Sequence, residues 1–160
     1  MKDRRIHWDN IDIDYDWCMK HHANTGVDVK PRKVPPQLAP FMKFARSQWK
    51  SKFAVLEYVC VRVVDKNNFS EEFPDYGEGF PDLHDNKLMS VCVCVKMPEA
   101  GGDWEIDTPE GKLYYPCGLG DGLIIRGDEQ HWVTRVKGDK IRITIAAHFK
   151  GVWEEWNTDS

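Results

Sequence analysis

From residue 54 onward the chain is a succession of short segments with β-strand character, separated by turns that contain Gly or Pro. The clearest segments are 55–64 (VLEYVCVRVV) and 88–97 (LMSVCVCVKM), and both are rich in β-branched residues. Further short strands are predicted at 104–107, 112–115, 122–126, 131–136 and 140–149. Many short strands joined in this way are typical of an all-β sandwich or barrel. The pattern therefore predicts a mainly β domain.

The N-terminal third of the chain has a different character. Residues 1–35 show no regular hydrophobic period, and we expect an irregular segment there. Between Leu38 and Phe53, apolar residues recur every three or four positions, which predicts an amphipathic helix over 36–53 that packs on the sheet. With 160 residues in all, we expect one domain over 1–160 whose β core is 54–150.

Composition and charge exclude several classes of protein. The chain has 22 Lys and Arg residues and 26 Asp and Glu residues, which gives a net charge of −4. This charge and the pI near 5.9 argue against a nucleic-acid partner. No segment reaches the roughly 20 apolar residues of a membrane span, and residues 1–18 lack a signal-peptide core. The five cysteines are not spaced like those of a disulfide-rich domain. We expect buried, reduced thiols and a cytoplasmic or other reducing compartment.

The segment 131–149 (HWVTRVKGDKIRITIAAHF) carries the most informative polar residues. The Gly-Asp pair at 138–139 predicts a hairpin turn between two β-rich runs. A hairpin that closes symmetrically about this turn would place His131, Arg142 and Thr144 on one face of the sheet. His131 and Arg142 would then be offset by about 13 Å along the strand. If their side chains lean toward each other, His131 and Arg142 could contact opposite ends of one short dicarboxylate.

A second polar cluster lies upstream, just before the strand predicted at 88–97. Here His84 is followed by Asp85 in the sequence PDLHDN. Together with the distant His131, these residues have the composition of a two-His-one-carboxylate iron(II) site. Iron(II) activates O₂, whereas zinc has no redox chemistry.

These residues resemble the iron(II)- and 2-oxoglutarate-dependent oxygenases, and the resemblance covers about residues 55–150. The pattern of that family is His-x-Asp, a later His, and an Arg about ten residues after it, often followed two positions on by Ser or Thr. This sequence has His84, then His131, then Arg142 with Thr144. The last His and the Arg are 142 − 131 = 11 residues apart.

Two glycine-containing turns add to the resemblance. Gly101 and Gly102 precede a short predicted strand, as does the family's Gly-Gly turn. Residues 118–125 (GLGDGLII) lie ahead of His131, like the family's approach to its second His. The resemblance implies a double-stranded β-helix, that is, a jelly-roll or cupin-like fold, with one or more N-terminal supporting helices.

The resemblance also implies a reaction and the residues that serve it. His84 and His131 would ligate iron(II). Arg142 would hold the distal carboxylate of the co-substrate 2-oxoglutarate through a bidentate contact, and Thr144 would add a hydroxyl hydrogen bond. The reaction would consume O₂, convert 2-oxoglutarate to succinate, and hydroxylate or demethylate a small molecule, an amino acid or a peptide.

The third protein ligand departs from the family pattern. A His-x-Asp sequence would place the carboxylate at position 86, but that residue is Asn86 and the acid is Asp85. On a regular strand His84 and Asn86 share a face while Asp85 points away. A bulge would bring Asp85 to the metal. The alternatives are Asn86 as a ligand through its carbonyl, or two His with an added anion, as in halogenating relatives.

The remaining expectations concern the substrate pocket and the competing functions. We expect the loop 67–82 to be a candidate lid, and the candidate pocket residues are Tyr76, Trp104, Tyr114, Trp132 and His148. The main alternative function is a non-catalytic, cupin-like β-barrel binding module. A nucleobase oxygenase is a lesser alternative because the chain is acidic. The sequence carries no sign of the oligomeric state.

Overall fold

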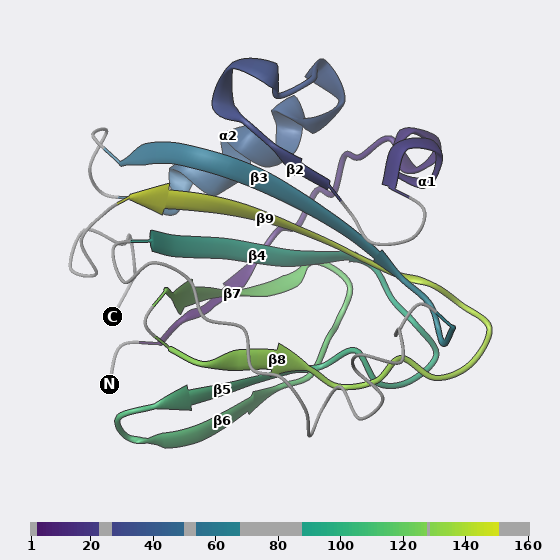
Figure 1. Cartoon of the computed structure of the whole chain (residues 1–160), viewed down its shortest axis with the longest axis vertical. Helices are drawn as coiled ribbons and strands as arrows, with labels where there is room; N and C mark the ends of the chain where they lie inside the picture. Colours follow the sequence, from purple (N-terminus) through teal and green to yellow (C-terminus); the bar gives the residue numbers. More distant parts are fainter. Residues whose placement is uncertain (1–2, 23–26, 50–53, 68–87, 128, 151–160) are drawn as a thin grey trace.

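The computed structural model describes residues 3–22, 27–49, 54–67, 88–127 and 129–150 (Figure 1). The helices are α1 (Tyr15–His22) and α2 (Ala39–Ser47), with single 3₁₀ turns at Pro31–Lys33 and Pro36–Leu38. The strands are β1 (Arg5–His7), β2 (Val27–Val29), β3 (Val55–Val64), β4 (Leu88–Lys96), β5 (Trp104–Thr108), β6 (Gly111–Tyr115), β7 (Asp121–Arg126), β8 (His131–Val133) and β9 (Arg142–Lys150).

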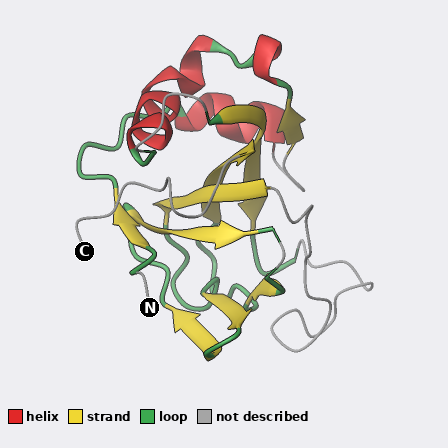
Figure 2. Cartoon of the chain, turned by 90° about the vertical axis from the view of Figure 1, so that its left-hand side faces the viewer, coloured by secondary structure: helices red, strands yellow, loops and turns green. Residues whose placement is uncertain are grey.

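The strands form two antiparallel sheets that face each other. The larger sheet has the order β1-β7-β4-β9-β3-β2, and the smaller has the order β6-β5-β8. The smaller sheet lies across one face of the larger, and the helices cover the other face (Figures 1 and 2). This arrangement confirms the prediction of a mainly β, jelly-roll-like fold supported by N-terminal helices.

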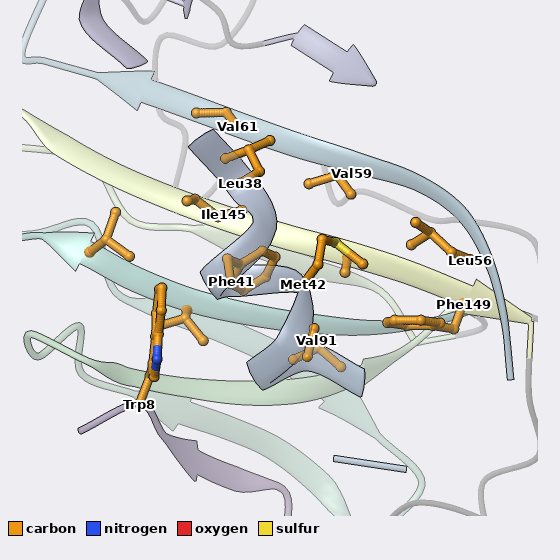
Figure 3. Close-up of a cluster of buried hydrophobic side chains, with 14 of the residues drawn as sticks. Trp8, Leu38, Phe41, Met42, Leu56, Val59, Val61, Val91, Ile145 and Phe149 are labelled. Atoms are coloured by element: carbon orange, nitrogen blue, oxygen red, sulfur yellow. The ribbon is translucent and has the colours of Figure 1, made fainter. Parts of the chain in front are cut away.

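The helix-covered face of the larger sheet holds the main hydrophobic core. Leu38, Phe41 and Met42 project from the helical segment onto β3, β4 and β9 (Figure 3). They meet the odd-numbered residues of β4, β9 and most of β3, because side chains alternate across a strand. In β3 the register shifts between Leu56 and Tyr58, so Leu56 joins the same face. The predicted helix over 36–53 is therefore found in part, as a 3₁₀ turn followed by α2, which ends at Ser47. Residues 50–53 lie outside the described residues.

The space between the two sheets contains a second, smaller cluster. It combines side chains from both sheets, which shows that their inner faces are in contact. Its buried members are Cys92, Cys94, Trp104, Ile106, Cys117, Leu123 and Ile125. All five cysteines of the chain are free thiols and buried, as the sequence predicts.

Two predictions about local structure are wrong. Residues 1–35 are not irregular throughout, since β1 pairs with β7, β2 pairs with β3, and α1 lies between them. Strands of three residues are too short to show a clear alternation of apolar and polar residues, and α1 is too polar to show an apolar stripe.

No helix among the described residues has the length and apolar character of a membrane span.

The predicted hairpin between the last two strands is also wrong. β8 pairs with β5 in the smaller sheet, whereas β9 pairs with β3 and β4 in the larger one. Gly138 does have the positive φ of a turn, +88°. The chain uses that region to cross from one sheet to the other, and hydrophobic alternation does not distinguish a crossing from a hairpin.

Candidate functional site

The inner face of β9 presents a row of polar side chains to the smaller sheet. Arg142 is only 2% exposed, and Thr144 and His148 are also buried. The Nη1 group of Arg142 donates a hydrogen bond to Thr144 Oγ1 at 3.3 Å. Its Nε and Nη2 groups are buried and have no hydrogen-bond partner. A buried donor without a partner costs about 1–3 kcal/mol, and more when it is charged. The row therefore contains a strong, uncompensated binding element for an anion.

Glycine at position 102 makes room for this arginine. Gly102 has φ +73°, and a Cβ atom there would lie 2.6 Å from Arg142 Cδ and 3.3 Å from the Pro98 side chain. On the other side, the Arg142 guanidinium lies 5.2 Å from the centre of the Trp104 ring, a cation–π distance. The Gly-Gly turn predicted before the 104–107 strand thus serves the site, because any larger residue would displace Arg142.

Two thiols lie next to the guanidinium. The pKa of Cys117 is lowered to about 7, mainly by a hydrogen bond with Cys94 and further by the charge of Arg142 and a hydrogen bond with its guanidinium, although burial acts in the opposite direction. The pKa of Cys94 is raised, because its thiol hydrogen bonds to Cys117 and is buried. The sequence identified these cysteines only as buried thiols. Their proximity to Arg142 depends on the register of β4 against β9, where Cys94 lies opposite Thr144.

His131 lies on the smaller sheet, at the start of β8. It is directly opposite Ile106, an inward-facing residue of β5, so its side chain also faces the larger sheet. Its Nδ1 atom is 3.0 Å from the carbonyl oxygen of Glu129. A carbonyl only accepts, so Nδ1 carries the proton and Nε2 carries the lone pair of the neutral ring. This is the tautomer that a metal-ligating His uses when its other nitrogen is held by a carbonyl.

A buried ion pair fixes the loop that supplies that carbonyl. The carboxylate of Glu129 accepts hydrogen bonds from both terminal nitrogens of Arg4, at 2.6 and 3.0 Å. It also accepts one from the backbone N–H of Arg126, at 3.0 Å. Both side chains are 4% exposed. Sequence reasoning missed this pair, because the two residues are 125 positions apart and nothing in either neighbourhood signals the other.

The register of the strands places His131 and Arg142 toward opposite ends of the inner space. Trp104, which contacts Arg142, lies opposite Val133, whereas His131 lies two residues further along β8. Near the end of β9, His148 is opposite Ser90 of β4, and Ser90 is in turn opposite Ile125, the next-to-last residue of β7. The turn after β7 leads directly to His131. His131 and His148 therefore lie toward one end, and Arg142 toward the other.

His148 belongs to a buried polar group of its own. Its Nδ1 atom is 2.6 Å from the hydroxyl oxygen of Ser90, and its ring stacks on Tyr58 with centroids 4.1 Å apart. The side chain is 4% exposed. Its side chain lies on the inner face, and its role in a substrate pocket stays a prediction.

The structure does not bring all the predicted pocket residues together. Trp104 is buried in the inner cluster, beside Arg142. Tyr114 and Trp132 both lie opposite Glu105, so they share the outer face of the smaller sheet and point away from Arg142. Tyr114 is 56% exposed and donates to Asp103 Oδ2, while Lys112 lies over the Trp132 ring.

The upstream part of the predicted metal site cannot be placed. Tyr76, His84, Asp85 and Asn86 lie outside the described residues, as does most of the candidate lid. Within the described ranges, no group of three or more His, Cys, Asp or Glu side chains is arranged to hold a metal ion. Of the predicted ligands, only His131 falls within those ranges, and so the metal site stays a prediction.

Comparison with known proteins supports the fold. No protein-family model and no curated protein matches the chain. The viral collagen prolyl hydroxylase of Paramecium Bursaria Chlorella virus-1, solved with 2OG, is similar over 92% of this chain and 95% of its own, with 16% identity and a TM-score of 0.51. A cupin protein from Bacteroides fragilis is similar over 86% and 87%, with 14% identity and a TM-score of 0.41. The likeness to the hydroxylase concerns the fold alone, and it agrees with the two facing antiparallel sheets of a jelly-roll-like arrangement.

Proposed function

We propose that this protein is an iron(II)- and 2-oxoglutarate-dependent oxygenase that acts on a small molecule, an amino acid or a peptide. The observation that carries the proposal is Arg142, which is buried between the sheets with two donors unpartnered. A buried cation with unsatisfied donors is costly, and natural proteins tolerate it where a ligand completes the hydrogen bonds.

The free donors of Arg142 fit a carboxylate. Nε and Nη2 lie along one edge of the guanidinium group, which is the edge that pairs with both oxygens of a carboxylate. Nη1 is already directed to Thr144, and the Thr144 hydroxyl retains its own proton to donate. A carboxylate at this position would satisfy both orphaned donors and receive a third hydrogen bond from Thr144.

The metal end of the proposed site rests on His131. With Nδ1 held by the Glu129 carbonyl, Nε2 is the ring atom that would ligate the metal. In the proposal His84 is the second ligand, and Asp85 or Asn86 the third. Bound iron(II) and 2-oxoglutarate would together supply the oxidising power for hydroxylation or demethylation, with succinate as the second product.

The residues of the chain have separate tasks in this scheme. Arg142 and Thr144 orient the dicarboxylate, and Trp104 covers the guanidinium and excludes water from it. Arg4 and Glu129 hold the carbonyl that fixes the His131 ring. His148 lies toward the same end as His131, where it would face the substrate. The register difference between Arg142 and His131 would leave room for an elongated dicarboxylate between the two ends of the inner space.

The proposal is tested by anaerobic addition of iron(II) and 2-oxoglutarate, with titration of the weak visible absorption of the metal–keto acid complex. Wild-type protein should show this band, and Arg142→Ala should weaken 2-oxoglutarate binding about 100-fold or more. Arg142→Lys should restore it only in part, because an ammonium group does not make the bidentate contact.

A matched control is Arg135→Ala, which removes an exposed arginine from the segment after β8. It should bind 2-oxoglutarate like the wild type. If folded wild-type protein shows no band, or if Arg142→Ala binds with unchanged affinity, the oxygenase proposal fails and the binding-module alternative takes its place.

A further inference from the structure

The outer face of the smaller sheet carries a row of side chains that the inner site does not use. Tyr114 on β6 and Trp132 on β8 both lie opposite Glu105 on β5. Neighbouring strands are about 4.8 Å apart, so the strands that carry the two rings are about 10 Å apart, with Glu105 between them. Asp107 and Lys112 are the next pair on the same face. We call these five residues the outer aromatic surface.

This surface is accessible to solvent. Tyr114 is 56% exposed, Asp107 and Lys112 are also exposed, and Glu105 and Trp132 are partly exposed. The described helices, by contrast, lie on the larger sheet (Figure 2). Aromatic side chains are enriched where proteins bind partners, because each ring offers a large contact area at a low cost in conformational entropy. Two rings side by side on an open sheet therefore indicate an interaction surface.

The charges of the surface favour a cationic partner. Within the described part of the chain, neither Glu105 nor Asp107 forms an ion pair, even with Lys112. The Lys112 ammonium instead lies 4.5 Å from the centre of the Trp132 ring. A cation at that distance is attracted by the π-electrons of the indole. The surface thus already accommodates one cation on a ring, and it keeps two carboxylates available for others.

We propose that the outer aromatic surface binds a segment of a partner protein that carries two arginines three positions apart in a polyproline II conformation. In that conformation residues i and i+3 lie on the same side, about 9.3 Å apart, which matches the spacing of the two rings. One guanidinium stacks on Tyr114 and the other on Trp132, in place of Lys112. Glu105 lies between them and pairs with their free donors.

Arginine fits this surface better than lysine does. Its planar guanidinium stacks on an aromatic ring while its N–H groups remain free for a neighbouring carboxylate, whereas an ammonium group is a single point charge. Binding here needs neither iron nor 2-oxoglutarate, because all five residues face away from Arg142 and the inner space. The outcome is therefore independent of the proposed function.

The first experiment titrates the peptide acetyl-Gly-Arg-Pro-Pro-Arg-Gly-amide into the wild-type protein at low ionic strength and follows the amide signals of β5 and β6 by NMR. These signals should shift as peptide is added, and a peptide with Gln in place of both arginines should leave them unchanged. Two adjacent arginines should bind about fivefold more weakly, because only one guanidinium reaches a ring. High salt should weaken binding, since exposed charges are screened.

Substitutions on the surface should change the affinity in opposite directions. Trp132→Ala and Tyr114→Ala should each weaken binding about tenfold, and Tyr114→Phe, which keeps the ring, should bind like the wild type. Glu105→Gln combined with Asp107→Asn should also weaken it about tenfold. Lys112→Ala should tighten binding about threefold, because it removes a cation that competes for the Trp132 ring. The variants at Tyr114 and at the two acids decide the matter even if Trp132→Ala fails to fold.

The matched control is Asp12→Asn combined with Asp16→Asn, which removes the same charge from exposed residues of the N-terminal segment. It should bind the arginine peptide like the wild type, and equal weakening by both pairs of substitutions would mean general charge attraction and overturn the proposal. Absence of binding by the arginine peptide, equal binding of the Gln peptide, or weaker binding by Lys112→Ala also overturns it.

Two other occupants of the surface have distinct signatures. If cellotetraose shifts the β5 and β6 signals and the arginine peptide does not, the surface binds sugars and the proposal fails. If the wild type forms a concentration-dependent dimer that Trp132→Ala dissociates, a second copy of the chain covers the surface, and the proposal fails as well.

Discussion

The two faces of strand β9 differ in a way that separates stability from function. Its odd-numbered residues, Ile143, Ile145, Ala147 and Phe149, are fully buried on the helix-covered face and belong to the main hydrophobic core. Its even-numbered residues include Arg142, Thr144 and His148, which are almost as deeply buried but polar. One face of the strand therefore belongs to the hydrophobic core. The other face lines a polar interior in which Arg142 has two buried donors without a hydrogen-bond partner. The comparison shows that the burial of a side chain does not by itself identify the residues that stabilise this fold.

The largest effect is expected on the helix-covered face. Phe149→Ala should lower the free energy of unfolding by about 3–5 kcal/mol, because it leaves a cavity beneath α2. The ring also makes an edge contact with Trp49, at 5.5 Å between centroids. Urea denaturation measures the loss. Thr144→Val, on the opposite face of the same strand, is the matched control and should cost far less. Equal losses would contradict the division between the two faces.

The buried ion pair should be the next most sensitive feature. Glu129→Gln leaves Arg4 charged in a site that is 4% exposed, and this should cost about 3 kcal/mol. Arg4→Met combined with Glu129→Gln should cost less than the sum of the single changes. Asp139→Asn breaks an exposed pair with Lys66 and should leave the unfolding curve unchanged. Additive single and double variants would show that the two side chains do not act as a pair.

Arg142 should show the reverse of the usual effect of changing a buried residue. Arg142→Met removes two unpartnered donors and a charge, so the free energy of unfolding should stay unchanged or rise by about 1 kcal/mol. Binding of 2-oxoglutarate should be lost in the same variant. Ile143→Ala, one residue away on the other face, should instead destabilise the protein by about 2–5 kcal/mol. A clear destabilisation by Arg142→Met would mean that the guanidinium is structural.

The smallest expected effect is a dependence on alkaline pH. Burial raises the pKa of Cys18 from 9.0 to about 11, so the folded protein keeps its proton where the unfolded chain has lost it. The unfolded state is therefore favoured as pH rises from about 9 to 11, and the contribution of Cys18 to stability falls over that window. Urea denaturation at pH 8 and pH 10.5 should show a smaller decrease for Cys18→Ala than for the wild type. An identical decrease would contradict this assignment.

The sequence predicted the parts of the fold whose pattern is local. The strand at 55–64 matches β3, and the other six predicted strands are found with shifts of a few residues, because alternation and Gly or Pro turns mark them clearly. Pairing was not predictable: whether β8 folds back on β9 or crosses to the other sheet depends on which faces find apolar partners. For the same reason Arg142 and Thr144 could be selected from their spacing, but the position of Trp104 beside Arg142 and of Cys94 opposite Thr144 could not. The ion pair of Arg4 and Glu129 had no local signal at all.

The Arg4–Glu129 pair has a practical consequence for any attempt to build a minimal version of this protein. A shortened chain that starts after β1 would retain every candidate ligand and the whole of the inner cluster. It would nevertheless leave Glu129 without its cation, and the carbonyl that holds His131 would lose its anchor. Under the proposed function, such a fragment should fold and still bind iron poorly. Expression tags and truncations at the amino end therefore belong among the variables that an activity screen must control.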